Sequence, residues 1–484
     1  MLFNQRFVFF VLGLLLLVEG AFMLLSGMVA LYYQEYDFPY HLVSALISSS
    51  AGLLLAWFNK KVPRDVGKRE GYIIVALVWV VFSLFGLLPF WISGAIPSFT
   101  DAFFETMSGF TTTGSSILDD VEALPHGLLF WRSIIQWLGG MGIIVFSLAI
   151  LPILGLGGMQ LFVAEVPGPV PDKLHPRVTE TAKRLWVIYV SFTAIQAVLL
   201  VLGDMPLFDA ICHAFTTMAT GGYSTKQASI AYYDSPYIQY VMIVFMFIAG
   251  MNFALSYLLF HGKLKKVFQN EELRFYFWFV LGIGAFVGCI LYFNDTVSSF
   301  EQAFRDGLFQ TVSIITTTGY ATADYLEWVP FLGVIMFMLM FFGGSAGSTG
   351  GGVKIVRIVL LLKNSVNELK RLIHPNAVIP VRFNGKSVAQ PIITNVLAFI
   401  VIYMLLTGIS LVVMSSMGYD LETSIGAVAT SLGNIGPGMG EFGPSVTFSQ
   451  MPDVGKWFLS FLMLMGRLEL FTIILIFTPS FWKR

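Results

Sequence analysis

A six-residue stretch, Ile315-Thr316-Thr317-Thr318-Gly319-Tyr320, recurs in weaker form three more times along the chain. The copies align without gaps on four glycines, Gly114, Gly222, Gly319 and Gly436. Thirteen residues before them stand Asp101, Asp209, Asp306 and Thr423, all of types that cap helix N-termini. Each copy therefore predicts a short apolar helix that begins at this cap and ends just before its glycine.

These helices are too short to cross a membrane. At ~1.5 Å per residue each rises about 15 Å, roughly half of a ~30 Å hydrocarbon core. Such a half-helix directs its C-terminal carbonyls at mid-membrane, and the glycine lets the next residues turn their carbonyls inward, which favours a cation stripped of water. Thr-Thr-Gly is also common in ordinary turns, but four copies in register between long apolar segments favour the half-helix interpretation.

The composition agrees with a membrane protein. Hydrophobic residues make up 56% of the chain and charged residues 12%, and the mean hydropathy is +0.77. The formal net charge of −1 argues against a nucleic-acid partner. The two cysteines, Cys212 and Cys289, lie in apolar segments, which indicates packing rather than a disulfide framework or a metal site.

The apolar segments predict an all-α polytopic membrane protein with ten transmembrane spans. We expect an N-terminal two-span hairpin followed by four pore repeats, each made of a span, a half-helix and a second span. The hairpin is residues 1–58, and the repeats are residues 72–154, 185–260, 275–372 and 392–479. Three of the second spans are expected at Leu128 to Leu154, Tyr237 to Phe260 and Trp457 to Phe477.

The distribution of charge predicts the orientation. Most of the 28 lysines and arginines fall in segments that the layout assigns to one side, among them residues 60–69, 173–184, 263–274 and 354–386. The turns that carry the half-helices hold mainly acidic residues instead. Under the positive-inside rule, both termini are cytoplasmic and the half-helices enter from outside.

Four glycine turns around one axis make a four-sided filter within one chain. This layout resembles the superfamily of potassium transporters that comprises TrkH, TrkG, KtrB and the plant HKT proteins, which look like four fused copies of a potassium-channel subunit. Three features resemble the TrkH type in particular: the extra N-terminal hairpin, the segment Trp131 to Gly142 (WRSIIQWLGGMG), and Gly466-Arg467-Leu468-Glu469. The resemblance implies K⁺ uptake across the bacterial inner membrane, a homodimer, and a TrkA-like cytosolic ring that binds nucleotides and controls the gate.

The filter is expected at the four turns that end in glycine. Its residues are Thr111, Thr112, Thr113 and Gly114; Ala219, Thr220, Gly221 and Gly222; Thr316, Thr317, Thr318 and Gly319; and Gly433, Asn434, Ile435 and Gly436. Glycine at all four positions resembles the potassium-selective members. The fourth turn departs most from the threonine pattern, so we expect only approximate four-fold symmetry.

A glycine-rich run interrupts the third repeat. It reads Gly343, Gly344, Ser345, Ala346, Gly347, Ser348, Thr349, Gly350, Gly351 and Gly352. A helix does not persist through so many glycines, because each costs about 1 kcal/mol relative to alanine. Irregular backbone at membrane depth must be buried in protein or line water, so the run is expected under the filter, although a plain cytoplasmic loop is the alternative. The family resemblance implies an intramembrane loop that obstructs the pore.

Arg467 stands about halfway along an expected span, where a lone arginine costs ~2.5–3.5 kcal/mol on insertion scales. Either it forms a buried ion pair with a neighbouring helix, or it faces the pore below the filter and repels cations. Family resemblance favours the second role, and the two are compatible. Glu469 is too near in sequence to share its helix face.

No nucleotide-binding loop or catalytic constellation is visible, so we expect neither an enzyme nor an organic cofactor, with K⁺ as the transported ion. The rival function is a polytopic carrier for an organic solute, or a membrane-embedded enzyme, whose half-helices bind an anionic substrate. An anion carrier presents half-helix N-termini to its substrate, whereas here the C-termini point inward. The basic inner loops are expected to dock the cytosolic ring, although they would equally suit anionic lipid.

Overall fold

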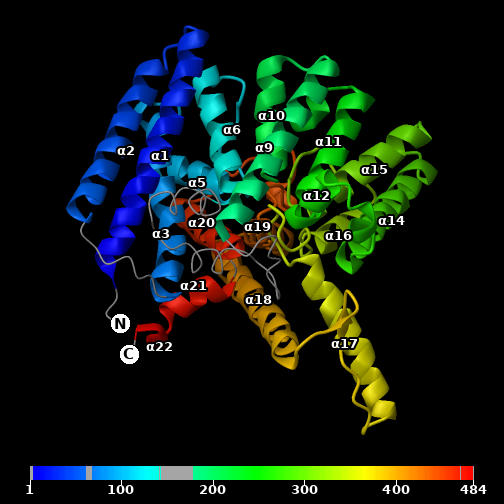
Figure 1. Cartoon of the computed structure of the whole chain (residues 1–484). Helices are drawn as coiled ribbons and strands as arrows, with labels where there is room; N and C mark the ends of the chain where they lie inside the picture. Colours follow the sequence, from blue (N-terminus) through cyan, green and yellow to red (C-terminus); the bar gives the residue numbers. More distant parts are fainter. Residues whose placement is uncertain (1–3, 61–67, 141, 143–177, 469, 483–484) are drawn as a thin grey trace.

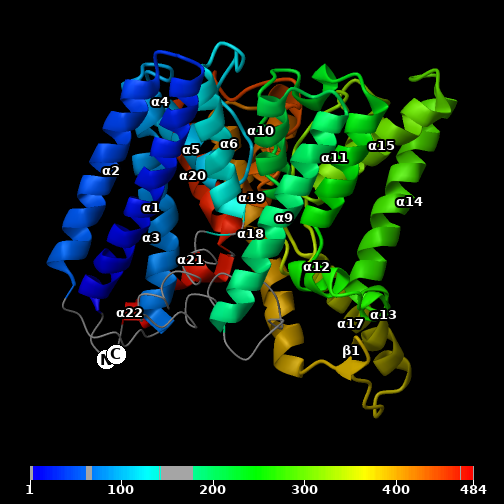
Figure 2. The ribbon, with the colours of Figure 1, turned by 45° about the horizontal axis from the view of Figure 1, so that its top comes forward.

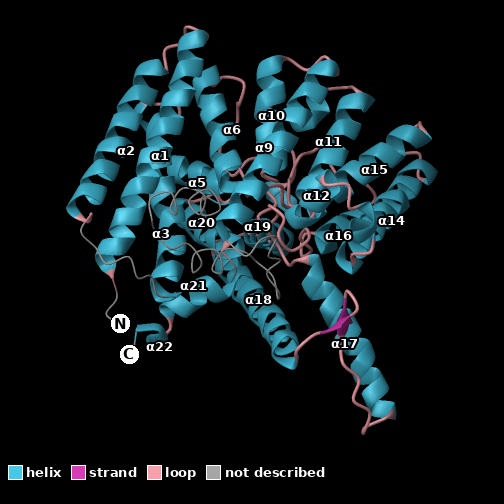
Figure 3. Cartoon of the chain, in the orientation of Figure 1, coloured by secondary structure: helices cyan, strands magenta, loops and turns pink. Residues whose placement is uncertain are grey.

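The protein is described from a computed structural model that covers residues 4–60, 68–140, 142, 178–468 and 470–482. The described chain is mostly helical, with one small antiparallel pair of strands, β1 (Arg382–Phe383) and β2 (Lys386–Ser387). Figure 3 shows how helices dominate the molecule. In Figure 1, helix α17 (Ile355–Ile373) projects from the body of the molecule, and the two strands lie beside it.

The N-terminal hairpin is made of α1 (Gln5–Tyr32) and α2 (Phe38–Phe58). The two helices pack closely because glycines face each other. A Cβ atom added at Gly13 would lie 2.6 Å from the carbonyl oxygen of Gly52, and one added at Gly52 would lie 2.6 Å from that of Gly13. Helix α1 also packs against α3 (Lys68–Gly86) and α6 (His126–Gly140), which joins the hairpin to the rest of the molecule.

Four short helices precede the four glycines, and longer helices surround them (Figure 2). They are α5 (Phe99–Phe110), α10 (Leu207–Met218), α15 (Phe300–Ile315) and α19 (Leu421–Gly433). Nearly all of their inner residues are buried.

The predicted caps of these helices are wrong. The residues at the N-cap positions are Ser98, Pro206, Ser299 and Asp420, so the predicted cap residues lie inside the helices. Ser98 and Asp420 supply the capping oxygens, and these accept from the backbone N–H groups of Asp101 and Thr423. In the first turn Asp101 is still favourable, because a carboxylate there complements the positive end of the helix dipole.

The other helices flank these four. They are α4 (Leu88–Ile92), α9 (Val178–Leu202), α11 (Pro236–Ala249), α12 (Phe253–Phe260), α13 (Leu264–Phe268), α14 (Glu271–Phe293), α16 (Pro330–Leu339), α18 (Gln390–Ser416), α20 (Asp453–Arg467), α21 (Leu470–Phe477) and α22 (Pro479–Trp482). Two 3-10 turns lie at Ser229–Tyr232 and Gly440–Phe442. Within the described ranges, six helices are long and apolar enough to cross a membrane, or eight if each bent pair counts as one span.

Two spans that the sequence predicts as continuous are broken. Helices α11 and α12 meet at 109°. Helix α11 ends at Ala249, and α12 starts anew after Asn252, whose side chain caps it. Helices α20 and α21 meet at 115°, immediately after Arg467. The inner part of the expected span Leu128 to Leu154 and residue Glu469 lie outside the described residues. The count of ten spans therefore stays a prediction.

Candidate functional site

All four short helices end in the same turn. In each, the residue before the glycine donates its N–H to the carbonyl five residues upstream, which is the longer bond of a Schellman motif. The bonds are Thr113 to Ser108 (2.8 Å), Gly221 to Thr216 (2.9 Å), Thr318 to Ser313 (2.9 Å) and Ile435 to Thr430 (3.0 Å). The repeated sequence pattern is thus a repeated three-dimensional turn.

Each turn also contains two left-handed residues separated by one residue. Their φ angles are 55° and 88° at Thr112 and Gly114, 54° and 74° at Thr220 and Gly222, 58° and 82° at Thr317 and Gly319, and 54° and 101° at Asn434 and Gly436. Left-handed backbone costs a non-glycine residue ~1–2 kcal/mol, and a β-branched threonine is an outlier there. The sign of φ therefore alternates along each turn, and the same strained pattern is repeated in all four turns.

The four glycines form a closed ring of contacts. A Cβ atom added at each would lie against the carbonyl oxygen that precedes the glycine of the next turn. The distance from the added Cβ atom to that carbonyl oxygen is 2.2 Å for Gly114 and Gly221 and 2.0 Å for Gly222 and Thr318. It is 2.0 Å for Gly319 and Ile435 and 2.9 Å for Gly436 and Thr113. Since the last contact returns to the first turn, residues that are far apart in the sequence surround one axis.

The fourth turn differs from the other three in packing as well as in sequence. Its ring contact is the loosest, and the carbonyl oxygen of Gly436 accepts hydroxyls from Thr430 (2.6 Å) and Ser115 (3.1 Å). The side-chain amide of Asn434 donates to Thr113 Oγ1 and to the carbonyl of Met463, both at 2.9 Å. The ring is therefore only approximately four-fold.

The glycine-rich run 343–352 lies against the C-terminal ends of three of the short helices. The N–H of Gly351 donates to Thr317 Oγ1 (2.8 Å), and the Thr349 hydroxyl donates to the carbonyl of Met218 (3.1 Å). A Cβ atom added at Gly351 would lie 2.4 Å from the carbonyl oxygen of Gly433. No residue of the run is exposed, which argues against a plain cytoplasmic loop.

Polar contacts from several elements hold the run. Its two ends meet where the N–H of Gly343 donates to the carbonyl of Val353 (2.8 Å). The backbone N–H of Ala346 donates to Glu272 Oε1 on α14 (2.8 Å), and the ammonium of Lys354 donates to the carbonyl of Gly350. The run thus has a defined conformation although its sequence has little intrinsic preference.

Arg467 is the last residue of α20 and not the middle of a continuous span. Its Nη1 donates to the carbonyl of Thr349 (2.6 Å), and its Nη2 donates to the carbonyls of Gly139 (2.5 Å) and Gly140 (3.0 Å). The guanidinium thereby connects the glycine-rich run to the end of α6. Arg467 is only partly buried, and no sequence pattern indicated these backbone acceptors.

A hollow of about 560 Å³ adjoins this arrangement. Its lining includes Thr349 and Gly350 of the run together with one carboxylate, Glu272, and four cationic residues, Lys354, Arg357, Lys386 and Arg467. A concentration of positive charge beside the glycine-rich run opposes the passage of a cation through this region.

Gln136, in the segment Trp131 to Gly142, contacts the second turn through its side-chain amide, and no sequence pattern predicts this contact. Its Nε2 donates to the carbonyl of Gly221 (2.7 Å), and its Oε1 accepts from the N–H of Tyr223 (3.0 Å). His213 is packed rather than solvent-facing, and it contacts the carbonyl of Asp209 and the hydroxyl of Ser224. Within the described ranges, no group of three or more His, Cys, Asp or Glu residues is arranged to hold a metal.

Known proteins share this sequence and fold. The family model for TrkH, described as a cation transport protein, matches residues 42–484. The potassium uptake protein TrkH of Salmonella typhimurium is 41% identical over 476 residues, which are 98% of both chains, and TrkG of Escherichia coli is 35% identical over 483 residues, 99% of both. The crystal structure of the potassium transporter TrkH from Vibrio parahaemolyticus matches with a TM-score of 0.90 at 38% identity, covering 99% of this chain and 100% of that one.

These matches confirm the resemblance seen in the sequence. They extend over nearly the whole chain at identities well above the level at which family membership is in question, and the apolar helices agree with a multi-pass membrane protein. The relatives are named as potassium transport proteins, not as enzymes. The chain belongs to the TrkH family of cation transport proteins.

Proposed function

We propose that this protein takes up K⁺ across the inner membrane of a bacterium through a selectivity filter formed by the four glycine turns. The closed ring of glycine contacts is the observation that carries the proposal, since it surrounds one axis with four similar backbone turns. The names of the relatives, which are potassium uptake proteins, support the choice of ion.

In the filter, backbone carbonyls replace the hydration shell of the ion. The alternating sign of φ along each turn supports a filter in which carbonyls face the axis, as rings of carbonyl ligands for K⁺ require. The C-terminal ends of the four short helices add the negative ends of their dipoles to the same region. A dehydrated cation is therefore stabilised without any charged side chain in the filter.

Below the filter, the run 343–352 and Arg467 form a gate. The run contacts the ends of three short helices, and Arg467 donates to its Thr349 carbonyl. A fixed positive charge ~4 Å from a passing cation costs on the order of 4 kcal/mol at an effective dielectric of about 20. Opening requires that the run and the guanidinium move together, because a hydrogen bond joins them.

The assembly follows from the same family. We place ten spans in the membrane, with both termini in the cytoplasm, two copies in a homodimer, and a TrkA-like cytosolic nucleotide-binding ring on the basic inner segments. The printed names of the relatives refer to a Trk system, which supports further components. Anionic lipid is the other partner that basic inner segments suit.

The rival function, transport of an anionic organic solute, is less well supported. The ends of the short helices that meet around the axis are C-terminal, and they carry partial negative charge. They repel an anion.

Uptake of ⁸⁶Rb⁺ into proteoliposomes tests the proposal. We expect uptake by the wild-type protein, competition by K⁺, and little competition by Na⁺ or choline. Liposomes without protein are the control. Uptake no greater than in this control, or equal competition by Na⁺ and K⁺, would contradict the proposal.

A further inference from the structure

The position nine residues before each ring glycine has a common role in three of the four turns. The residues there are Glu105, His213, Gln310 and Ala427. The first three are polar, come from the middle of their short helices, and are almost completely buried. Buried polar side chains require partners, and these three find them in the strand that follows the ring glycine.

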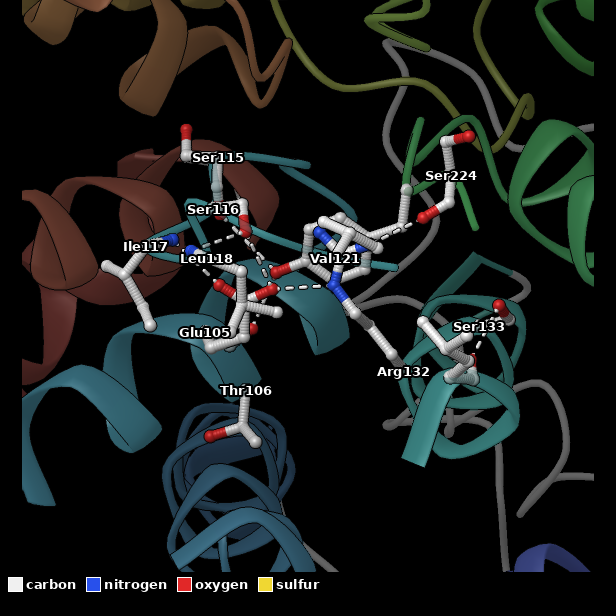
Figure 4. A network of polar contacts seen from close by, with 12 residues as sticks. Glu105, Thr106, Ser115, Ser116, Ile117, Leu118, Val121, Arg132, Ser133 and Ser224 are labelled. Carbon is white, nitrogen blue, oxygen red and sulfur yellow. Dashed lines mark hydrogen bonds and ion pairs between the residues drawn. The ribbon is translucent and has the colours of Figure 1, made fainter. Parts of the chain in front are cut away.

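Glu105 makes the most such contacts. Its Oε2 accepts from the backbone N–H of Ile117 (3.0 Å), and its Oε1 accepts from the hydroxyl of Ser116 (3.1 Å). The two partners lie two and three residues after Gly114 in the outgoing strand (Figure 4). The carboxylate therefore holds the strand just beyond the ring glycine of the first turn.

The equivalent side chains make fewer contacts of the same kind. His213 Nε2 lies 2.9 Å from the hydroxyl of Ser224, two residues after Gly222. Gln310 Nε2 donates to the carbonyl of Ala323 (3.0 Å), four residues after Gly319. Ala427 carries only a methyl group, so the fourth turn lacks this support, and it is also the turn with the loosest ring contact.

Arg132 of α6 strengthens the first support and joins it to the second turn. Its Nε donates to Glu105 Oε1 (2.7 Å), and the two side chains are 4% and 0% exposed. Its Nη1 donates to the carbonyl of Ser224 (2.9 Å), and its guanidinium lies 3.6 Å from the centre of the Tyr223 ring. Figure 4 shows Arg132 reaching from its helix to Glu105. The segment Trp131 to Gly142 thus has a structural purpose behind the filter.

Two tyrosine hydroxyls join neighbouring turns at the residues that stand nine positions before the ring glycines. Tyr223, directly after Gly222, donates to the backbone carbonyl of Glu105 (2.7 Å). Tyr320, directly after Gly319, donates to the backbone carbonyl of His213 (3.2 Å). The residue nine before the glycine is therefore a junction between one turn and the next, and a shift there is transmitted to two turns.

We propose that Glu105, held by Arg132, is a positioning residue for ion selectivity, and that the fourth turn, with Ala427 at the equivalent position, lacks this particular side-chain support. This inference rests on the proposed function, because it concerns the same filter. Discrimination between K⁺ and Na⁺ depends on where the carbonyls are held. Glu105 touches no ion, and it acts by fixing the strand that follows Gly114.

Replacing Glu105 by Gln tests the inference. Glu105→Gln keeps the size of the side chain but removes the charge that Arg132 and two donors share. Asp101→Asn is a matched control, because it removes a carboxylate from the first turn of the same helix, away from the outgoing strand. The Asp101 carboxylate pairs with the ammonium of Lys456 (2.5 Å). For each protein we would measure the ratio of Rb⁺ to Na⁺ uptake in proteoliposomes and the thermal unfolding midpoint.

We expect the ratio to fall about tenfold in Glu105→Gln, the factor that ~1.4 kcal/mol represents, and to change less than about twofold in Asp101→Asn. A purely structural ion pair predicts a lower unfolding midpoint with an unchanged ratio, and that result overturns the inference. If Glu105→Gln does not fold, Gln310→Leu decides: a reduced ratio supports the inference and a wild-type ratio overturns it. Absence of uptake by the wild-type protein would instead contradict the proposed function, so the two failures are distinguishable.

Discussion

Glycines are used differently in the ring and in the run 343–352. In the ring, three of the four glycines would bring a Cβ atom to within 2.0–2.2 Å of a neighbouring carbonyl, and all four have positive φ. In the run, the distance from an added Cβ atom to its nearest neighbour ranges from 2.2 Å at Gly343 and 2.4 Å at Gly351 to 3.1 Å at Gly347 and Gly352. The contacts of the run also include side chains of other elements, such as Glu272 and Thr317. Four equivalent backbone contacts fix the ring, whereas the run is held by a mixture of close backbone contacts and polar side-chain contacts.

This difference teaches why both regions need glycine. A ring glycine is required because no side chain fits and because the backbone is left-handed. A glycine in the run gives the backbone many accessible states at low cost, so the segment is able to shift when its polar contacts change. Substitutions should therefore damage selectivity in the ring and alter flux in the run.

The largest effect is expected from Gly319→Ser. The new Cβ would collide with the carbonyl of Ile435 at 2.0 Å, and φ is 82° at this position. Rb⁺ uptake should fall about 100-fold, or the preference for K⁺ over Na⁺ should be lost, since displacements of ~1 Å have effects of this size in active sites. Gly222→Ser should behave in the same way.

Gly333→Ser is the control for this comparison, because a Cβ atom at Gly333 in α16 would meet nothing within 4 Å. It should retain wild-type flux and preference. An unchanged K⁺ preference in folded Gly319→Ser protein would remove this glycine from the filter.

The next largest effect is expected from Arg467→Ala. Loss of the positive charge should raise Rb⁺ uptake at least about tenfold, the factor for ~1.4 kcal/mol, without changing the K⁺ to Na⁺ ratio. Arg467→Lys keeps the charge and should stay closer to wild-type flux. Uptake should be measured together with thermal stability.

A structural ion pair makes a different prediction for Arg467→Ala. It would leave a buried carboxylate unpaired at a cost of ~3–5 kcal/mol, and the protein would express poorly rather than leak. Stable Arg467→Ala protein with unaltered flux would contradict the gate altogether.

A smaller increase in flux, of a few-fold, is expected when part of Ser345 to Gly350 is deleted, again with an unchanged ion preference. Because Arg467 bonds to the carbonyl of Thr349, the deletion and Arg467→Ala should not be additive. Uptake by the two single variants and the combined variant measures this coupling. Fully additive effects on the logarithm of the rate would show that the run and the arginine act independently.

The smallest effect, none at all, is expected when nucleotides are added to the purified protein. If a separate ring controls the gate, then ATP, ADP and NADH should leave Rb⁺ uptake by this chain alone unchanged. The comparison is with the same vesicles before addition. A response without an added partner would locate nucleotide control within this chain.

Sequence reasoning succeeded where a local rule decides the conformation. The four ring glycines were found from their spacing, and all four have the positive φ that glycine favours. The interruption at residues 343–352 was predicted from the cost of glycine in a helix, and that run separates α16 from α17. The assignment of these residues to a filter and a gate remains a proposal.

The same reasoning failed where several local rules compete. Asp101 and Thr423 looked like caps, yet Ser98 and Asp420, three residues earlier, hold those positions. The apolar segments Tyr237 to Phe260 and Trp457 to Phe477 read as continuous helices, but each bends by more than 100°. Hydropathy does not reveal a bend, because both halves remain apolar.

The sequence by itself therefore determined the number and spacing of the glycine turns and the membrane-spanning character of the chain, since these depend on periodicity, hydropathy and glycine's backbone freedom. Only the tertiary structure decided which carbonyls receive Arg467, that Arg132 meets Glu105, and that Gly436 closes the ring on the first turn. Those contacts join segments from different parts of the chain, and their partners are set by how the helices pack around one axis, which no local pattern records.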